Sequence, residues 1–374
     1  MTTLLSAETL LDSPATTDVP AHPRLWTPRR VLVTASAAER PHTAEVLRRV
    51  AAHGVGDVEL LKGDRLTGLR GEDERTTYAR AKNTLAVVVS PPSDRKLQPI
   101  PPSADWQFHL ARGCPAHCQY CYLAGSLTGP PVTRVYADLD EILAGLPAYE
   151  GLGAVTSASA RRAGEGTTFE ASCYTDPLGL EHLTGSLAAA IRHFGARPEA
   201  GLRVTTKYDA VDGLLGLPHA GRTRLRFSVN AAAVSERFEG GTARVAARLA
   251  ALRRAALAGY PVGLVVAPIM PGEGWRDEYA ALFDAARAAV ADVVGLDLTA
   301  ELITHRFTPG SKEVLTGWYP RTRLEMDESR RSQKRGKFGA VKYVYRAPEM
   351  RELRGGIEGL LAERLPQARL LYWT

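Results

Sequence analysis

The sequence has few of the features that would set it apart from ordinary globular proteins. Only four of its 374 residues are cysteine, too few for a disulfide-stapled secreted scaffold. No apolar run approaches the ~18–20 residues that a helix needs to cross a bilayer, and residues 1–20 lack the basic start of a signal peptide. There is no internal repeat. These absences predict a protein of the reducing cytoplasm.

Composition and charge add two expectations. Apolar residues make up 45% of the chain and charged residues 24%, which is typical of a packed globular protein. The length allows two domains, or one large α/β domain with additions. Residues 321–346 hold nine Lys and Arg against three acidic residues, a surplus equal to the net +6 of the whole chain. This strip is either a solvated surface or, with its interleaved aromatics, a site for nucleic acid.

The order of apolar segments predicts an α/β fold. After a disordered tail (1–22), residues 28–100 are expected to form a small α/β domain with strands at 30–34, 57–61 and 85–90 and a helix at 43–52. The Pro-rich stretch 91–103 marks a boundary. Residues 104–310 then alternate strands with helices. The strands are expected at 168–172, 202–206, 224–229, 262–268 and 295–304, and the helices at 180–194, 210–217, 242–258 and 277–291.

This alternation predicts a parallel sheet, open or closed into a partial barrel. Chemistry in such folds lies at the carboxyl ends of the strands. Those ends carry Cys173, Lys207, Asn230, Pro268 and His305. Residues 151–166 are rich in Gly, Ala and Ser and are expected to form a flexible loop, while 311–374 form an extension that closes with a helix (349–365) and a strand (369–373).

Three of the four cysteines lie within eight residues. Cys114, Cys118 and Cys121 have the spacing C-x3-C-x2-C, so that one short loop can bring three thiolates to one centre. Thiolates select Zn, Cu(I) or iron–sulfur clusters. A four-iron cluster normally takes four thiolates. Three would leave one iron free to chelate a small molecule that carries an amine and a carboxylate, such as S-adenosylmethionine.

Other interpretations of the cysteines remain open at this stage. The three could join His117 or His109 in a structural Cys3His zinc site, although such sites usually draw their ligands as two separated pairs. Cys173 stands alone in FEASCYTDPLG. It is either a small buried hydrophobe or a thiol that faces the barrel mouth and donates a hydrogen atom to a carbon radical.

Several segments together resemble the spore photoproduct lyase family of radical S-adenosylmethionine enzymes. They are GCPAHCQYCYL, TRVYADLDEIL, FEASCYTDPLGLEHLTGSL, LRVTTKYDAVDGLL, GRTRLRFSVN, VAPIMPGEG, ELITHRFTPGSKEVL and YPRTRLEMDE. The resemblance covers roughly residues 28–374, and within it 151–166 looks like an insertion. It implies a partial (β/α)6 barrel with a [4Fe-4S] cluster at its mouth.

The resemblance also implies an activity. It is the reductive cleavage of S-adenosylmethionine to a 5′-deoxyadenosyl radical, which reverses 5-thyminyl-5,6-dihydrothymine in ultraviolet-damaged DNA to two thymines. That makes the chain a carbon–carbon lyase of DNA repair, served by an electron donor such as flavodoxin or ferredoxin. The rival hypotheses are a radical enzyme of this lineage with another nucleic-acid or small-molecule substrate and, more distantly, a non-catalytic zinc protein that binds nucleic acid.

Residue roles follow from the resemblance, position by position. The cluster ligands fall on Cys114, Cys118 and Cys121, and the hydrogen donor falls on Cys173. The tyrosines linked to radical return fall on Tyr120 and Tyr122, which could otherwise be loop packing. The cofactor contacts fall on Tyr122, Thr175 (a serine in the family), Lys207, Ser228 and the backbone of Ala267. Without this context, Lys207 could be a solvated lysine and Ser228 a strand-end cap.

One segment departs from the family pattern. Where the family's DNA-contacting hairpin carries an Arg-Tyr pair in a WGRYG-like stretch, this chain has Arg335, Gly336, Lys337, Phe338 and Gly339. Lysine still meets a phosphate but lacks the bidentate fork, and phenylalanine still stacks but lacks the phenol. We therefore expect Arg335, Lys337 and Phe338 to contact DNA, with lesion recognition altered.

Overall fold

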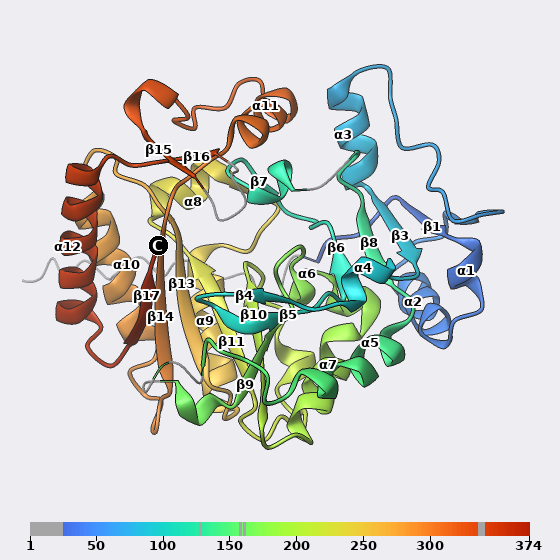
Figure 1. The fold of residues 1–374 in the computed structure, drawn as a ribbon, viewed down its shortest axis with the longest axis horizontal. Coiled ribbons are helices and arrows are strands. Elements are labelled where there is room, and N and C mark those ends of the chain that lie inside the picture. Colours follow the sequence, from blue (N-terminus) through green and yellow to red (C-terminus); the bar gives the residue numbers. More distant parts are fainter. Residues whose placement is uncertain (1–24, 127–128, 157–158, 160–161, 336–340) are drawn as a thin grey trace, which may run out of the picture.

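Two sheets organise the part of the chain that the structure describes. The structure is a computed structural model, and it describes residues 25–126, 129–156, 159, 162–335 and 341–374 (Figure 1). The expected disordered tail, 1–22, lies outside this range. Within it, no helix combines the length and apolar character that a bilayer crossing requires.

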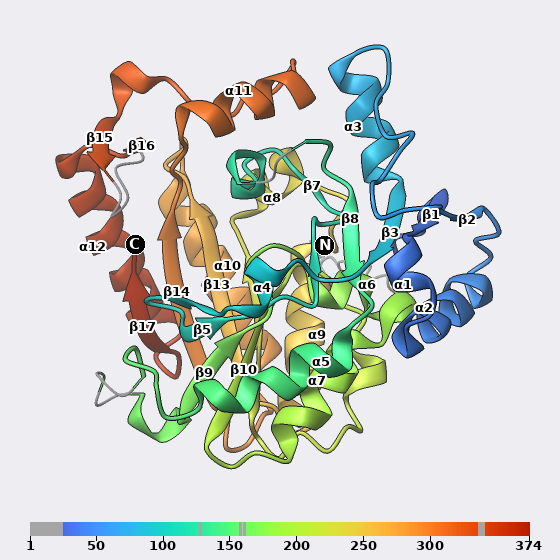
Figure 2. The ribbon, with the colours of Figure 1, turned by 45° about the vertical axis from the view of Figure 1, so that its right-hand side comes forward.

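The larger sheet is the predicted partial barrel. Its eight strands run in the order β17-β14-β13-β11-β10-β9-β5-β4, and every neighbouring pair is parallel except β4 with β5. The sheet curls but stays open between β17 and β4 (Figures 1 and 2). The strands are β4 (Gln98–Ile100), β5 (Ala104–Gln107), β9 (Thr167–Glu170), β10 (Ala200–Thr206), β11 (Thr223–Val229), β13 (Val262–Ile269), β14 (Leu298–Thr304) and β17 (Arg369–Trp373).

The alternation of side chains along β11 shows how the sequence builds this barrel. Successive residues of a strand face opposite sides of the sheet. Leu225, Phe227 and Val229 belong to the main hydrophobic core, while Arg226 and Ser228 line a cavity inside the barrel. All seven residues of β11 are buried. One face of the strand therefore packs against the helices, and the other face places polar side chains in the interior of the barrel.

Helices cover the outer face of the barrel, as the sequence predicts. They are α5 (Leu139–Gly145), α6 (Pro177–Thr184), α7 (Ser186–Gly195), α8 (Ala232–Phe238), α9 (Val245–Leu257), α10 (Trp275–Ala289) and α12 (Ala347–Arg364). The single helix expected at 180–194 is two helices, because Gly185 adopts a left-handed conformation (φ 66°) and caps α6. The helix expected at 210–217 is wrong. Only a 3-10 turn (Asp212–Leu214) forms there, because two glycines and a following proline disfavour a helix.

The smaller sheet combines residues from both sides of the expected domain boundary. Its order is β2-β1-β3-β8-β6, made of β1 (Arg30–Val33), β2 (Val58–Leu60), β3 (Thr84–Val88), β6 (Ala111–Arg112) and β8 (Thr133–Tyr136). Its core includes Leu180 and Leu183 from α6, against which α2 (Pro41–Ala52) packs. Each sheet takes strands from both predicted ranges, since β4 belongs to the larger sheet and β6 and β8 to the smaller one. The predicted domain ranges remain a prediction.

Two helices that the sequence analysis did not anticipate face each other above the barrel mouth. They are α3 (Glu74–Lys82), from the N-terminal unit, and α11 (Pro309–Trp318), from the C-terminal extension (Figures 1 and 2). The extension continues into an antiparallel hairpin, β15 (Ser332–Arg335) with β16 (Val341–Val344), and then into α12 and β17 as expected. Segments distant in sequence therefore enclose the mouth.

Candidate active site

The cysteine loop is held from both sides by backbone hydrogen bonds. Cys118 lies in β7 (His117–Cys118), which pairs with β12 (Glu239–Gly240) so that Cys118 is opposite Glu239. The N–H of Gly113 donates to the carbonyl of Tyr174 (2.8 Å), which ties the loop to the residue after Cys173. Gly113 has φ 84°, and a Cβ there would lie 2.4 Å from the carbonyl oxygen of Val132. Only glycine fits at that position.

The three loop thiols line one cavity. Cys118 is buried, and Cys114 and Cys121 are half-buried. Burial raises the pKa of the Cys114 thiol to about 12, and the pKa of Cys118 also moves upward because of burial. A thiolate in this loop therefore needs a positively charged partner, and a bound metal cluster supplies one.

The surroundings of the loop give no support to the zinc alternative. Among the residues that the structure describes, no three His, Cys, Asp and Glu side chains are grouped to hold one metal ion. His117 is instead hydrogen-bonded through Nδ1 to the hydroxyl of Tyr78 (2.8 Å). An iron–sulfur cluster, in contrast, takes its thiolates on separate iron atoms. The loop fits a cluster better than a single ion.

Lys82, on α3, supports the loop from behind and was missed by the sequence analysis. It is buried, and its ammonium donates to the carbonyls of Cys114 and Ala116. Burial lowers the pKa of Lys82, while negative charge on the loop cysteines would raise it. A buried cation beside three sulfurs stabilises negative charge there.

Cys173 faces the same cavity as the cysteine loop. The cavity has a volume of about 420 Å³. Cys173 follows β9, is 7% exposed and is not in a disulfide. Burial raises its pKa to about 12, so it is a neutral thiol at neutral pH, as a hydrogen-atom donor requires. The other predicted site residues on its wall are Tyr120, Tyr122, Thr175, Lys207, Ser228 and Ala267.

Predicted cofactor contacts on three adjacent strands converge. The ammonium of Lys207, which follows β10, donates to Ser228 Oγ on β11 (2.7 Å) and lies 3.4 Å from the carbonyl oxygen of Ala267 on β13. Thr175 lies on the same cavity, and its hydroxyl is buried without a hydrogen-bond partner among the described atoms. Buried hydroxyls normally have partners. An unused hydroxyl on the same cavity as a lysine fits a ligand with a carboxylate and an amine.

Glu239 is the functional residue that the sequence analysis missed most clearly. Its carboxylate accepts hydrogen bonds from the phenol of Tyr120 and the ammonium of Lys207 (2.9 Å), and it pairs with Arg248 (2.6 Å). Burial would raise the pKa of Glu239, but the charges of Lys207 and Arg248 outweigh it and lower the pKa to about 2. A permanent buried anion thus positions two predicted site residues. The sequence does offer a clue to the position of Glu239. The two glycines that follow it, Gly240 and Gly241, pack on His117, which precedes Cys118.

Asn230 is occupied by hydrogen bonds within the protein, whereas Tyr122 is largely exposed. Asn230 is fully buried, its amide donates to the carbonyl of Pro268 (2.8 Å), and its Oδ1 accepts from Tyr279 (2.9 Å), so it caps the strand end. Tyr122 is 62% exposed, although it lines the cavity. An exposed tyrosine at a cavity wall is free to contact a ligand.

The basic hairpin is anchored to the barrel at its base. Phe307 and Tyr343 exchange two backbone hydrogen bonds (3.2 and 2.8 Å). Arg331 stacks on the ring of Tyr345 at 3.8 Å and donates to the carbonyl of His305 (3.2 Å). Arg335, at the end of β15, is exposed. Lys337 and Phe338 lie outside the described residues, so their predicted contact with DNA remains a prediction.

Comparison with known proteins decides the family. The family model described as "Spore photoproduct lyase" matches residues 26–374. The chain belongs to the spore photoproduct lyase family. The spore photoproduct lyase of Geobacillus sp. (strain Y412MC61) is 41% identical over 349 residues, which cover 93% of this chain and 99% of that protein. The one from Bacillus subtilis (strain 168) is 38% identical over the same lengths.

Solved structures of spore photoproduct lyases match the fold as a whole. A spore photoproduct lyase in complex with dinucleoside spore photoproduct has a TM-score of 0.84 and 39% identity, covering 94% of this chain and 100% of that one. A mutant form with bound AdoMet and the same dinucleoside has a TM-score of 0.85 at 39% identity. The predicted family and partial barrel are therefore confirmed.

Proposed function

We propose that this protein is a radical S-adenosylmethionine DNA-repair lyase that splits the spore photoproduct into two thymines. The main support for the proposal is the shared cavity. The three loop cysteines, the separate buried thiol of Cys173, and Lys207 with Ser228 all line it. Spore photoproduct lyases that match over nearly the whole chain bind AdoMet and the dinucleoside lesion. A binding protein without chemistry would not need a neutral thiol on the same cavity as a three-cysteine loop.

The cofactors of this reaction are a [4Fe-4S] cluster and S-adenosylmethionine, and the residues present fit both. Cys114, Cys118 and Cys121 would hold the cluster. Lys207 would pair with the cofactor's carboxylate, and the free hydroxyl of Thr175 would take a further hydrogen bond. When bound together, the two groups supply a 5′-deoxyadenosyl radical that takes a hydrogen atom from the lesion.

The chain's own residues would complete the repair. Cys173 is proposed to give the hydrogen atom of its S–H to the thymine radical that remains after the cross-link breaks. Tyr120 and Tyr122 would then relay a hydrogen atom from the methyl group of 5′-deoxyadenosine to the Cys173 sulfur, which restores the thiol and leaves the adenosyl radical free to return to S-adenosylmethionine. Because Tyr120 donates its phenolic hydrogen to Glu239, its ring is held in one orientation beside Lys207. Ser228 and Ala267 would position the cofactor's nucleoside.

The partners would be ultraviolet-damaged DNA and a small electron donor such as flavodoxin or ferredoxin, in the cytoplasm. Support for DNA comes from β15, the exposed strand of the basic hairpin, which ends at Arg335. Flipping the lesion out of a duplex costs a few kcal/mol, which phosphate contacts and a stacking side chain offset. Lys337 and Phe338 occupy the segment where this chain departs from the family, and this departure favours the second candidate, a different lesion or substrate.

One assay separates these functions. The anaerobically reconstituted protein is reduced and incubated with S-adenosylmethionine and an oligonucleotide that carries the spore photoproduct. Repair predicts recovery of two thymines, with Cys173→Ala still cleaving the cofactor but failing to return hydrogen cleanly. An intact lesion alongside continued 5′-deoxyadenosine release would instead point to another substrate. Iron and sulfide analysis of the anaerobically purified protein, before any reconstitution, tests the zinc alternative.

A further inference from the structure

One wall of the cavity is a turn at the free edge of the open barrel. The turn joins β4 to β5 and places Ile100, Pro101, Pro102 and Ser103 on the cavity. β4 is the last strand of the sheet, and β5 pairs with β9 through only two residue pairs. Two of the turn residues are prolines, which have no N–H to donate. The turn keeps one backbone hydrogen bond, from the N–H of Ser103 to the carbonyl of Ile100 (3.0 Å), and side chains supply its other hydrogen bonds.

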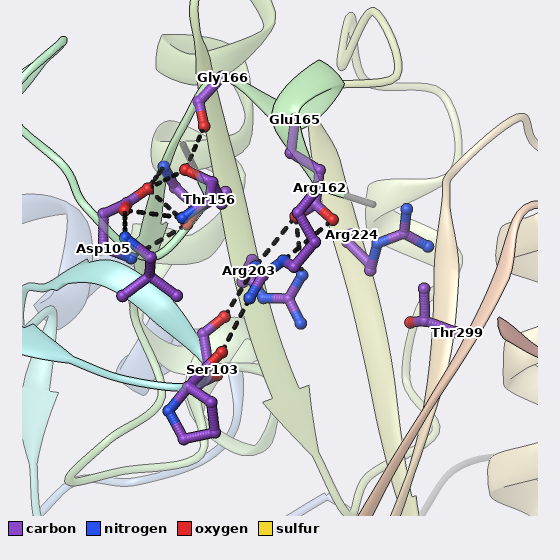
Figure 3. A network of polar contacts seen from close by, with 12 residues as sticks. Ser103, Asp105, Thr156, Arg162, Glu165, Gly166, Arg203, Arg224 and Thr299 are labelled. Atoms are coloured by element: carbon purple, nitrogen blue, oxygen red, sulfur yellow. Dashed lines mark hydrogen bonds and ion pairs between the residues drawn. The ribbon is translucent and has the colours of Figure 1, made fainter. Parts of the chain in front are cut away.

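Arg162 holds the carbonyl groups of this turn, while the hydroxyl of Ser103 donates to Glu170 (2.9 Å) and accepts from Arg226 (2.9 Å) inside the barrel. Its guanidinium donates from Nη1 to the carbonyl of Pro102 (2.8 Å) and from Nη2 to the carbonyl of Ser103 (2.9 Å) (Figure 3). Arg162 does not itself line the cavity, whereas both of its carbonyl partners do. It therefore holds the wall from the side away from the cavity.

The guanidinium is fixed in turn by a buried ion-pair relay. Arg162 is 5% exposed, and both Nε and Nη2 donate to Glu165 (3.2 and 3.0 Å). Glu165 also pairs with Arg203 on β10 (3.2 Å), which links the relay to the barrel wall (Figure 3). Burying a guanidinium is costly unless every donor finds a partner. This one is matched to two carbonyls and a carboxylate.

The segment that carries Arg162 is attached at a second point. Asp105, just after the turn, accepts hydrogen bonds from the backbone N–H groups of Val155 (2.6 Å) and Thr156 (3.1 Å). Its other oxygen accepts from the N–H of Thr168 on β9 (2.9 Å). The described parts of the region expected to be a flexible loop are thus attached at two points, to Asp105 and to the turn before it.

We propose that Arg162 is a positioning residue for the lesion. By binding the carbonyls of Pro102 and Ser103, it fixes an apolar wall of Ile100 and the two proline rings against which the bases of a pyrimidine dinucleotide pack. This inference rests on the proposed function. It assigns the described residues Val155, Thr156, Arg162 and Glu165 a role in substrate fit and leaves cofactor binding to Lys207 and Ser228.

The test compares Arg162→Met, which keeps the length of the side chain, with Arg162→Lys, which keeps its charge. Arg162→Met should raise the KM for the dinucleoside lesion about tenfold, with kcat and the KM for S-adenosylmethionine within about twofold, and Arg162→Lys should fall between it and the wild type. Arg197→Met is the matched control, because Arg197 pairs with Glu150 (3.0 Å) and does not line the cavity. It should change neither KM.

Hydrogen exchange supplies a readout that does not depend on activity. Peptides that cover residues 98–107 should exchange faster in Arg162→Met than in the wild type, since the turn loses its outer contacts. An unchanged KM for the lesion with unchanged exchange would overturn the proposal, as would a rise confined to the KM for S-adenosylmethionine. If Arg162→Met does not fold, the same two measurements on Arg162→Lys decide. If the wild type leaves the lesion intact, the proposed function fails, and hydrogen exchange alone still tests whether Arg162 holds the turn.

Discussion

Two buried carboxylates of this barrel, Glu239 and Glu301, look alike in most respects. Each is held by two cations and accepts a hydrogen bond from a tyrosine, Tyr120 for Glu239 and Tyr372 for Glu301 (2.5 Å). For both, burial would raise the pKa, but the paired cations lower it to about 2. Burial and a displaced pKa therefore do not distinguish a functional carboxylate from a structural one.

The cations make the difference. Glu301 pairs with Arg203 and Arg226, whose side chains are 1% and 2% exposed. Glu239 pairs with Arg248 and with Lys207, which is 16% exposed and also reaches two predicted cofactor contacts. A lysine is a flexible point charge that can exchange partners, whereas arginine forks lock a geometry. Through Lys207, the Glu239 group can respond to a ligand. The two arginines tie Glu301 to neighbouring strands of the barrel, although Glu301 and Arg226 line the cavity as well.

The largest effect should come from the cysteine loop opposite Glu239. Cys118→Ala removes one of three thiolates, and a cluster with two protein ligands should not persist. We expect the loss of iron, of the visible absorption of the cluster and of S-adenosylmethionine cleavage, down to background. Cys173→Ala is the matched control, because it removes a thiol on the same cavity that is not a predicted ligand. Equal iron content in Cys118→Ala and wild type would contradict the ligand assignment.

The second effect tests the structural carboxylate. Glu301→Leu leaves Arg203 and Arg226 buried without their shared partner, which should lower the free energy of unfolding by ~3–5 kcal/mol. Urea unfolding followed by circular dichroism measures it. Glu352→Leu is the control, because Glu352 pairs with Arg276 on the surface at 61% exposure and should cost ~0.5 kcal/mol or less. Similar losses in both variants would mean that the buried network does not stabilise the barrel.

The barrel itself could be predicted from the sequence because its core strands repeat one pattern. Each is a short run of apolar residues bounded by turn residues, and helices with apolar faces lie between them. α3 was missed because its sequence, ERTTYARAK, is strongly polar and buries only Tyr78, Ala81 and Lys82. Its signal was Asp73, which caps the helix by accepting from the N–H of Thr76 (2.6 Å).

The candidate site was predictable only where its chemistry lies within one segment. The spacing of Cys114, Cys118 and Cys121 predicts the cysteine loop, and the family motifs predict Cys173 and Lys207 as site residues. Glu239 lies far along the chain from Cys118, and only the pairing of β7 with β12 brings them together. Spacing gives no information on such cross-strand partners. The sequence analysis missed Arg162 for a similar reason. A Gly- and Ala-rich segment suggests mobility, and the two points at which this segment is attached to the barrel are visible only in the structure.

The third effect tests the functional carboxylate against the structural one. Glu239→Gln keeps the shape but removes the charge that holds Lys207, so the Kd for S-adenosylmethionine on the reconstituted protein should rise about tenfold, or ~1.4 kcal/mol. Equilibrium dialysis under anaerobic conditions measures it. Glu301→Gln makes the same chemical change and should leave this Kd unchanged. Equal shifts in the two variants would erase the distinction drawn between the two groups.

The smallest predicted effect comes from a substitution on the basic hairpin, away from both the Glu239 and the Glu301 group. Arg335 is exposed at the end of β15, so Arg335→Gln should leave the Kd for S-adenosylmethionine and the stability unchanged. Because a phosphate contact releases about one counterion, the variant should weaken DNA binding a fewfold and reduce the slope of log K against log salt by about one. Fluorescence anisotropy with a labelled duplex over a salt series measures both. A variant with an unaltered slope would place Arg335 on the solvated surface and move DNA recognition elsewhere on the chain.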